Sequence, residues 1–131
     1  MKLFWAIAVG AAVGGVSRFY LAAAIQQRLG STFPWGTLAI NITGSLLLGF
    51  LLRYAMATPA ISLELRAMLT VGFCGGYTTF SSYSYETMVL LEDGEIGRAA
   101  VYALGSVALA LLATFAGFVL ARELLAFRQR F

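Results

Sequence analysis

The sequence has 131 residues, of which 60% are hydrophobic and 11% are charged, and its mean hydropathy is +0.84. A small soluble core cannot bury so much apolar surface, so the composition predicts a membrane protein. The net charge of +3 comes from scattered arginines rather than a basic stripe, so no nucleic-acid partner is implied. The single cysteine excludes an intrachain disulfide, and the absence of histidine excludes a Cys/His metal site.

Four apolar stretches approach or exceed the roughly 17 to 25 residues that cross a bilayer as a helix. They cover about residues 3–26, 35–57, 64–91 and 97–121. Because the connections between them are too short for a folded domain outside the membrane, we expect one all-α transmembrane domain over residues 1–131. We interpret the first stretch as a helix and not as a cleavable signal, since Arg18 interrupts it and three further spans follow.

The basic residues that flank these stretches are divided unequally between the two ends of the expected bundle. Six lie on the side of the N-terminus: Lys2, Arg53, Arg66, Arg122, Arg128 and Arg130. Arg28 and Arg98 lie on the other side. The positive-inside rule therefore predicts that both termini are cytoplasmic, although three of the six cations belong to the tail after the fourth stretch.

The first two stretches contain small and polar residues that need a reason inside a bilayer. The spacing of Gly10 and Gly14 favours close approach of a neighbouring helix. Arg18 either snorkels to an interface, if the helix ends near Tyr20, or sets a positive potential at a vestibule. Asn41 either bonds a backbone carbonyl of a neighbouring helix or directs an N–H donor at an anion.

The fourth stretch carries three hydroxyl groups, on Tyr102, Ser106 and Thr114, at intervals of four and eight residues. Steps of four keep side chains close to one helix face. Such hydroxyls can simply bond back to carbonyls of their own helix, but a row on one face is better explained as a polar track.

The third stretch contains GFCGGYTTFSSYSYE, residues 72–86. Its glycines are poor helix formers and its threonines are β-branched, so we expect a helix break in mid-membrane at Gly72, Gly75, Gly76 and the following threonines. The freed carbonyls would suit a cation and the freed N–H groups an anion. Hydroxyls expected to cap the two ends are those of Thr78, Thr79, Ser81, Ser82 and Ser84. A packing kink between close-set helices is the alternative.

These motifs resemble the Fluc or CrcB family of small bacterial fluoride channels over essentially the full chain. The matching elements are a glycine-rich first helix ending in Arg18, GTLAINITGSLLLG with Asn41, GFCGGYTTFSSYSYE, and Tyr102 with Gly105 and Ser106. The resemblance implies a passive, fluoride-selective channel and not an enzyme. It would export cytoplasmic fluoride across the bacterial inner membrane and give fluoride resistance. The family fold is an antiparallel, dual-topology dimer of four-helix subunits with a broken third helix.

The resemblance also implies roles for single residues. One structural sodium ion would be held at the dimer centre by the backbone carbonyls of Gly75 and Thr78. The residues implied for the fluoride pathway are Asn41, Phe80, Ser81, Tyr83, Ser84, Glu86, Tyr102, Ser106 and Thr114, with Arg18 at a vestibule.

Two of these pathway residues raise questions of their own. Phe80 would present the positive edge of its ring to fluoride, and Tyr83 stands where the family has a second phenylalanine. Its hydroxyl would either line the path or turn toward the polar track. Glu86, beside an anion path, would be protonated, hydrogen-bonded to a hydroxyl, or mobile.

Two other classes of function compete with the channel. A small dual-topology multidrug or cation antiporter would need an acid in the first helix, where Arg18 is the only charge. A non-conducting subunit that scaffolds a larger complex would need neither the hydroxyl row nor the break. We expect a homodimer, but a pair of two different chains with opposed orientations follows if the six-to-two charge bias fixes this chain in one orientation.

Overall fold

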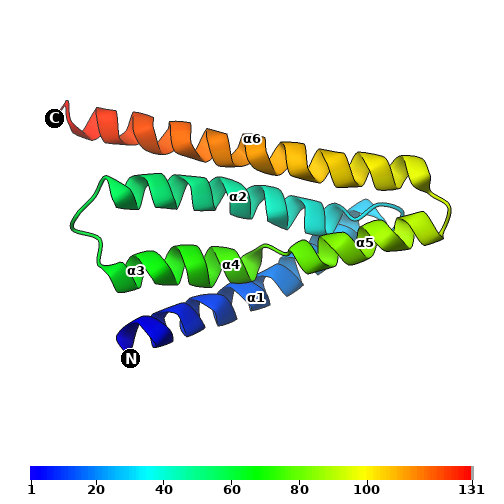
Figure 1. Ribbon diagram of the computed structural model, residues 1–131, viewed down its shortest axis with the longest axis horizontal. Coiled ribbons are helices and arrows are strands. Elements are labelled where there is room, and N and C mark those ends of the chain that lie inside the picture. The colour runs from blue at the N-terminus through cyan, green and yellow to red at the C-terminus, as the bar shows by residue number, and fades with distance from the viewer. Residues whose placement is uncertain (131) are drawn as a thin grey trace.

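The computed structural model describes residues 1–130, and within that range all regular secondary structure is helical. The long helices are α1 (Lys2–Leu29), α2 (Trp35–Met56) and α6 (Ile96–Arg128). Between α2 and α6 lie α3 (Leu63–Ala67), a π-helical segment η1 (Met68–Cys74), α4 (Gly75–Tyr77) and α5 (Phe80–Glu92). The helices run along one long axis, and both termini lie at the same end as the connection from α2 to α3 (Figure 1).

Three helices, α1, α2 and α6, are long and apolar enough to cross a membrane. Both α1 and α6 extend beyond their predicted C-terminal ends. The predicted third span differs because residues 78 and 79 interrupt it. The part before the interruption covers residues 63–77, and α5 after it has 13 residues, so neither is a full span alone. In Figure 1 the two parts follow one another along the bundle.

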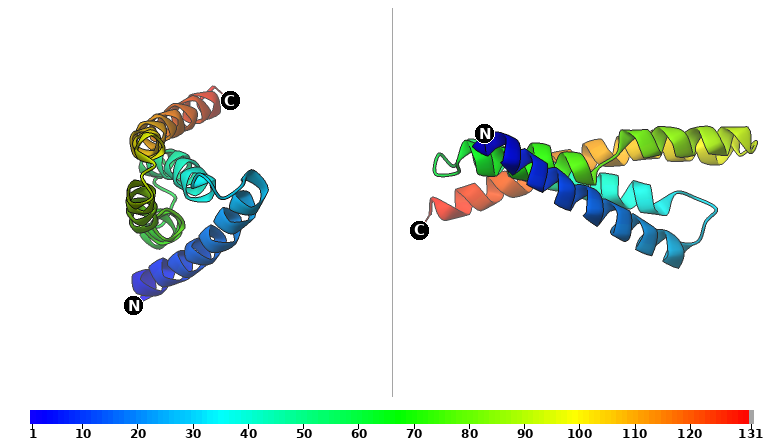
Figure 2. Two further views of the ribbon diagram at one scale, coloured as in Figure 1. Left: turned by 90° about the vertical axis from the view of Figure 1, so that its right-hand side faces the viewer. Right: turned by 90° about the horizontal axis from the view of Figure 1, so that it is seen from below.

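Close helix contacts depend on glycines of α1, as their spacing predicts. Helix α2 packs along α6, while α1 packs against η1 and α4. Figure 2 shows α1 inclined to α6 where it passes across the bundle. A Cβ added to Gly10 would overlap the carbonyl oxygen of Met68, and one added to Gly14 would overlap that of Phe73. The neighbouring Gly15 faces open space, so only the first two glycines set this contact.

The break in the third segment is present, but the glycines do not cause it. Gly76 remains helical, and a Cβ there would lie 2.6 Å from the carbonyl oxygen of Ala11 in α1. The backbone instead becomes extended at Thr78, with ψ 159°, and at Thr79, with φ −149°. Gly72 and Gly76 therefore serve close packing against α1, whereas a Cβ on Gly75 would meet open space. The β-branched threonines adopt the extended conformation that they favour.

The connection from α1 to α2 is held by the side-chain amide of Gln26. Its Nε2 donates to the Phe33 carbonyl at 2.9 Å, and its Oε1 accepts from the Gly36 N–H at 3.0 Å. Because α1 continues to Leu29, the alternative that this helix ends near Tyr20 is wrong.

Candidate functional site

Asn41 projects from α2 onto the break. Its Oδ1 accepts a hydrogen bond from the Thr79 N–H at 2.7 Å, and its Nδ2 donates to the Thr79 carbonyl at 3.0 Å. In a continuous α-helix the Thr79 N–H would donate to the carbonyl of Gly75. Asn41 therefore joins two helices through the backbone, as one of its two predicted roles requires, and the Gly75 carbonyl loses its helical partner.

The hydroxyl groups of the two threonines bond to different helix ends. Thr78 Oγ1 donates at 2.9 Å to the Cys74 carbonyl, which already accepts from the Thr78 N–H, so this bond satisfies no freed group. Thr79 Oγ1 accepts from the Ser82 N–H at 3.1 Å, and Thr79 is the N-cap of α5. The expectation that these hydroxyls cap the freed ends is confirmed for Thr79 and is wrong for Thr78.

The serines of this segment behave differently from one another. Ser81 Oγ lies 3.1 Å from Thr79 Oγ1, so it supports the cap without making it. Ser84 Oγ donates to the Phe80 carbonyl of its own helix at 2.9 Å. The expectation that Ser84 caps a freed helix end is therefore wrong.

Arg18 lies beside the break in the middle of α1. Its guanidinium is half-buried, and Nη1 approaches the Thr78 carbonyl oxygen at 3.5 Å. Carbonyls at a helix C-terminus carry partial negative charge, which a nearby cation offsets. The charge of Arg18 therefore stands at the end of the first half-helix rather than at an end of α1.

A cavity of about 230 Å³ opens beside the break. Its lining is Asn41, Ser45, Leu48, Thr78, Thr79, Phe80, Tyr83, Ser106, Val107 and Ala110. The side chain of Ser106 is 7% exposed, and its hydroxyl has no hydrogen-bond partner among the described residues. A buried hydroxyl without a partner costs about 1–3 kcal/mol, so this group calls for a ligand or a water molecule.

Tyr83 connects this cavity to α6. Its hydroxyl donates to the Ala103 carbonyl at 3.1 Å, so the group that a phenylalanine lacks is used by the backbone of α6. Its ring centroid lies 5.3 Å from that of Phe80 and 5.5 Å from that of Tyr102. The ring therefore remains beside Phe80 at the cavity wall.

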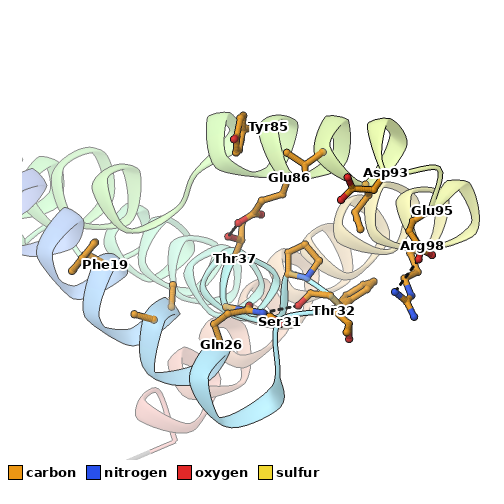
Figure 3. Close-up of a pocket in the computed structure, with 17 residues that line it drawn as sticks. Phe19, Gln26, Ser31, Thr32, Thr37, Tyr85, Glu86, Asp93, Glu95 and Arg98 are labelled. Atoms are coloured by element: carbon orange, nitrogen blue, oxygen red, sulfur yellow. Dashed lines mark hydrogen bonds and ion pairs between the residues drawn. The ribbon is translucent and has the colours of Figure 1, made fainter.

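Glu86 accepts two hydrogen bonds from hydroxyl groups. Thr37 Oγ1 donates to Oε1 at 2.7 Å, and the Tyr102 hydroxyl donates to Oε2 at 2.6 Å. This geometry agrees with the hydrogen-bonded alternative among the three considered for the carboxyl group. Glu86 and Thr37 also line a larger cavity of about 590 Å³ between α1, α5 and the α1–α2 connection (Figure 3).

Tyr102 links the two cavities although it is only 1% exposed. Its hydroxyl bonds to Glu86 at the larger cavity, and its ring packs against Tyr83 at the smaller one. The contacts of Glu86, Tyr102 and Tyr83 thus form a continuous series between the two cavities.

The comparison with protein families decides the identity of the chain. A family model described as CrcB-like protein, Camphor Resistance (CrcB), matches residues 5–118. The chain belongs to the CrcB family. It is a multi-pass membrane protein and not an enzyme.

Relatives of this CrcB-family chain cover nearly its whole length. A protein of Geobacter sulfurreducens named fluoride-specific ion channel FluC is 51% identical over 124 residues, 95% of this chain and 100% of the relative. A protein of the same name in Thermus thermophilus is 47% identical, over 90% of this chain and 94% of the relative. For the one in Pelobacter propionicus the identity is 46%, over 95% and 97%. None of these names supports the antiporter alternative.

Not all residues predicted for the site come together in this CrcB-family chain. Thr114 Oγ1 donates to the Ala110 carbonyl of its own helix at 3.0 Å and lines neither cavity. Ser81 and Ser84 also lie outside both linings. The predicted row on α6 is therefore interrupted after Ser106.

Two hydroxyl-bearing residues of α2 that line the cavities were not predicted from the sequence. Thr37 and Ser45 lie four residues on either side of Asn41 in α2, and each lines one of the cavities. The same four-residue spacing that marks the hydroxyls of α6 would have found them.

Proposed function

We propose that this chain conducts fluoride passively and selectively out of the cytoplasm, across the bacterial inner membrane. The cavity beside the break is the observation that carries the proposal, above all the buried and unpartnered hydroxyl of Ser106. Fluoride is small and strongly hydrated, so a narrow path must replace its water with donors. A hydroxyl that donates to no other acceptor can donate a hydrogen bond to the ion without breaking a hydrogen bond within the protein.

The other groups of the cavity suit the same ion. Phe80 and Tyr83 bring aromatic rings, whose edges carry partial positive charge. Arg18 adds a positive potential near the break. The two hydroxyls on Glu86 occupy its oxygens, which reduces the repulsion of an anion beside it. The names of the relatives support fluoride as the ion. Chloride would be rejected chiefly by its size.

We further propose that the chain crosses the membrane four times and works as an antiparallel homodimer. The segments α3, η1, α4 and α5 would together make the third crossing. Phe80 lines the cavity but is 77% exposed, so one chain leaves the path open on one side. A second copy facing the break would close it. A tag-accessibility assay in cells should find both orientations of the chain, and a single orientation would favour a pair of different chains.

A structural sodium ion at the centre of this dimer is also part of the proposal. The Gly75 carbonyl has lost its helical partner, and the Thr78 carbonyl has only the long contact with Arg18. One chain supplies two such oxygens and two copies supply four, which fits a hard cation that prefers carbonyl ligands. Replacing sodium with N-methyl-D-glucamine should lower the Tm of the purified protein. An unchanged Tm would count against the site.

The central experiment is fluoride efflux from liposomes that contain the purified protein, measured with a fluoride electrode in the presence of sodium and valinomycin. Rapid release of fluoride without release of chloride supports a selective passive channel. Well-folded protein that releases no fluoride would exclude the channel formed by this chain alone. Proton-coupled cation uptake would then test the antiporter.

A further inference from the structure

A third cavity, of about 370 Å³, lies between the C-terminal ends of α2 and α6. This is the end of the bundle that carries both termini (Figure 1). Its lining is Arg53, Met56, Ala57, Arg122, Leu125, Ala126 and Gln129, and no carboxylate is among them. We propose that this cavity, the arginine pocket, binds the phosphate group of an anionic lipid.

The guanidinium charges of the two arginines of the pocket are weakly paired or unpaired among the described residues. Within residues 1–130, Arg53 makes no hydrogen bond and no ion pair. Arg122 pairs with the adjacent Glu123 at 3.1 Å, but both side chains are about two-thirds exposed, at 67% and 65%. Exposed pairs of this kind contribute little, so a better ligand can displace Glu123. Guanidinium groups match the geometry of phosphate oxygens, to which each can donate two hydrogen bonds.

These two arginines do not serve to offset the partial negative charge at the C-terminal ends of α2 and α6. Near the end of α2, the Ala55 carbonyl already accepts from Arg66 Nη2 at 3.1 Å. The Arg128 guanidinium donates a hydrogen bond to the Tyr54 hydroxyl. Neither Arg53 nor Arg122 donates to a helix carbonyl among the described residues. Among the described residues, Arg53 therefore has no partner for its charge, and Arg122 has only its exposed contact with Glu123.

The rest of the lining favours a lipid over a free phosphate ion. Met56 and Leu125 give the pocket an apolar wall next to the two guanidinium groups. A lipid headgroup presents the same combination, with a phosphate attached to glycerol and acyl chains. The pocket also lies at the ends of two helices that are long and apolar enough to span a membrane. The end of a membrane-spanning helix lies at the depth of the lipid headgroups. Basic pockets between membrane helices are known to bind anionic headgroups in this way.

Native mass spectrometry of the purified full-length protein tests the proposal. The protein is incubated with phosphatidylglycerol or, separately, with phosphatidylcholine of the same acyl chains, and the retained lipid is counted. Wild type should retain phosphatidylglycerol in preference to phosphatidylcholine. The double variant Arg53→Gln/Arg122→Gln should lose about 30-fold in affinity for phosphatidylglycerol, since each arginine near the headgroups contributes about fivefold to binding. Arg53→Lys/Arg122→Lys should fall in between, because lysine keeps the charge and loses the paired donors.

The control is Arg28→Gln/Arg98→Gln, which removes the same charge at the opposite end of the bundle. An equal loss in this control would overturn the pocket, as would equal retention of the two lipids by wild type. A second arm adds inorganic phosphate alone and follows the Tm. A rise in Tm that depends on Arg53 and Arg122 and equals that given by phosphatidylglycerol would overturn the lipid as ligand. If the double variant fails to fold, the single variants Arg53→Gln and Arg122→Gln carry the test, with a loss of about fivefold expected for each.

Discussion

Asn41 binds both backbone polar groups of Thr79, accepting from its N–H at 2.7 Å and donating to its carbonyl at 3.0 Å. One side chain of α2 thus fixes the position of the residue at which the third segment is interrupted. That residue is the N-cap of α5 and also lines the smaller cavity. Asn41 consequently determines the geometry of the site even without touching an ion.

The first prediction compares two changes at Asn41. Asn41→Ala leaves both groups of Thr79 without a partner and should lower the free energy of unfolding by about 1–3 kcal/mol. Asn41→Asp keeps the acceptor but places a carboxyl group at the anion cavity, so fluoride efflux should fall by at least about tenfold. Thermal unfolding in detergent and liposome efflux measure the two effects. Efflux from Asn41→Asp equal to that of wild type would show that the ion does not pass this residue.

The second prediction concerns the hydroxyl of Ser106. Ser106→Ala removes a buried donor that has no partner among the described residues, so stability should not fall and should rise by up to about 1–3 kcal/mol. Fluoride efflux should fall about tenfold, the effect of one lost hydrogen bond to the ion. Thr87→Val is the matched control, since its hydroxyl bonds the Tyr83 carbonyl of its own helix and lines neither cavity. Equal losses in the two variants would contradict a direct role for Ser106.

The third prediction separates the ring of Tyr83 from its hydroxyl. Tyr83→Phe loses the bond to the Ala103 carbonyl and should lower stability by about 0.5–1.5 kcal/mol, while efflux stays within about threefold of wild type. Tyr83→Ile removes the ring edge and should reduce efflux strongly. If Tyr83→Phe abolishes efflux and Tyr83→Ile does no worse, the hydroxyl and not the ring serves conduction.

The fourth prediction addresses the pair of Glu86 and Tyr102. Their hydrogen bond of 2.6 Å is partly buried, and a hydrogen bond within a protein typically contributes about 0.5–1.5 kcal/mol. Glu86→Gln, Tyr102→Phe and the double variant form a double-mutant cycle. We expect a coupling of about 1 kcal/mol or more in the free energy of unfolding. A coupling near zero would mean that the carboxyl group does not depend on this hydroxyl.

The fifth prediction uses two adjacent glycines of α1. Gly14→Ala forces a methyl group against the Phe73 carbonyl and should destabilise the protein by about 1–3 kcal/mol. Gly15→Ala meets open space, and because alanine favours helices it should be neutral or stabilising by up to about 1 kcal/mol. The Tm of Gly14→Ala should therefore fall, while that of Gly15→Ala should stay unchanged or rise. Equal shifts would show that α1 does not pack closely at Gly14.

The sequence was sufficient to predict the helical architecture and the place of the break, because both depend on local composition. Long apolar runs identify α1, α2 and α6, and the Thr78–Thr79 pair disfavours helix by its β-branched side chains. The reason for the break was partly misread. Glycine has the same low helix propensity whether it ends a helix or lets a neighbour approach, and only the position of α1 shows which is true of Gly76.

The site was predicted less completely because its assembly depends on the rotation of each helix. Ser106 and Thr114 are eight residues apart, yet only Ser106 lines the cavity, while the Thr114 hydroxyl bonds the Ala110 carbonyl of its own helix. The partner of the Tyr83 hydroxyl lies 20 residues away on α6, and the two hydroxyls on Glu86 come from α2 and α6. Such contacts join segments that are far apart in the sequence, so they cannot be predicted from the residue spacing within one helix.

The π-helical segment Met68–Cys74 gives the third segment a tolerance to chain length that no side chain reveals. Its wide turn lets the Gly75 N–H donate to the Thr70 carbonyl, five residues earlier. A π-helical turn holds about one residue more than an α-helical turn, so deleting one residue from η1 would close it into α-helix and leave Thr78 and Thr79 directed toward Asn41. The same deletion in a wholly α-helical stretch would turn all that follows it by about 100°. The extra residue of η1 is therefore not needed to direct the break toward α2.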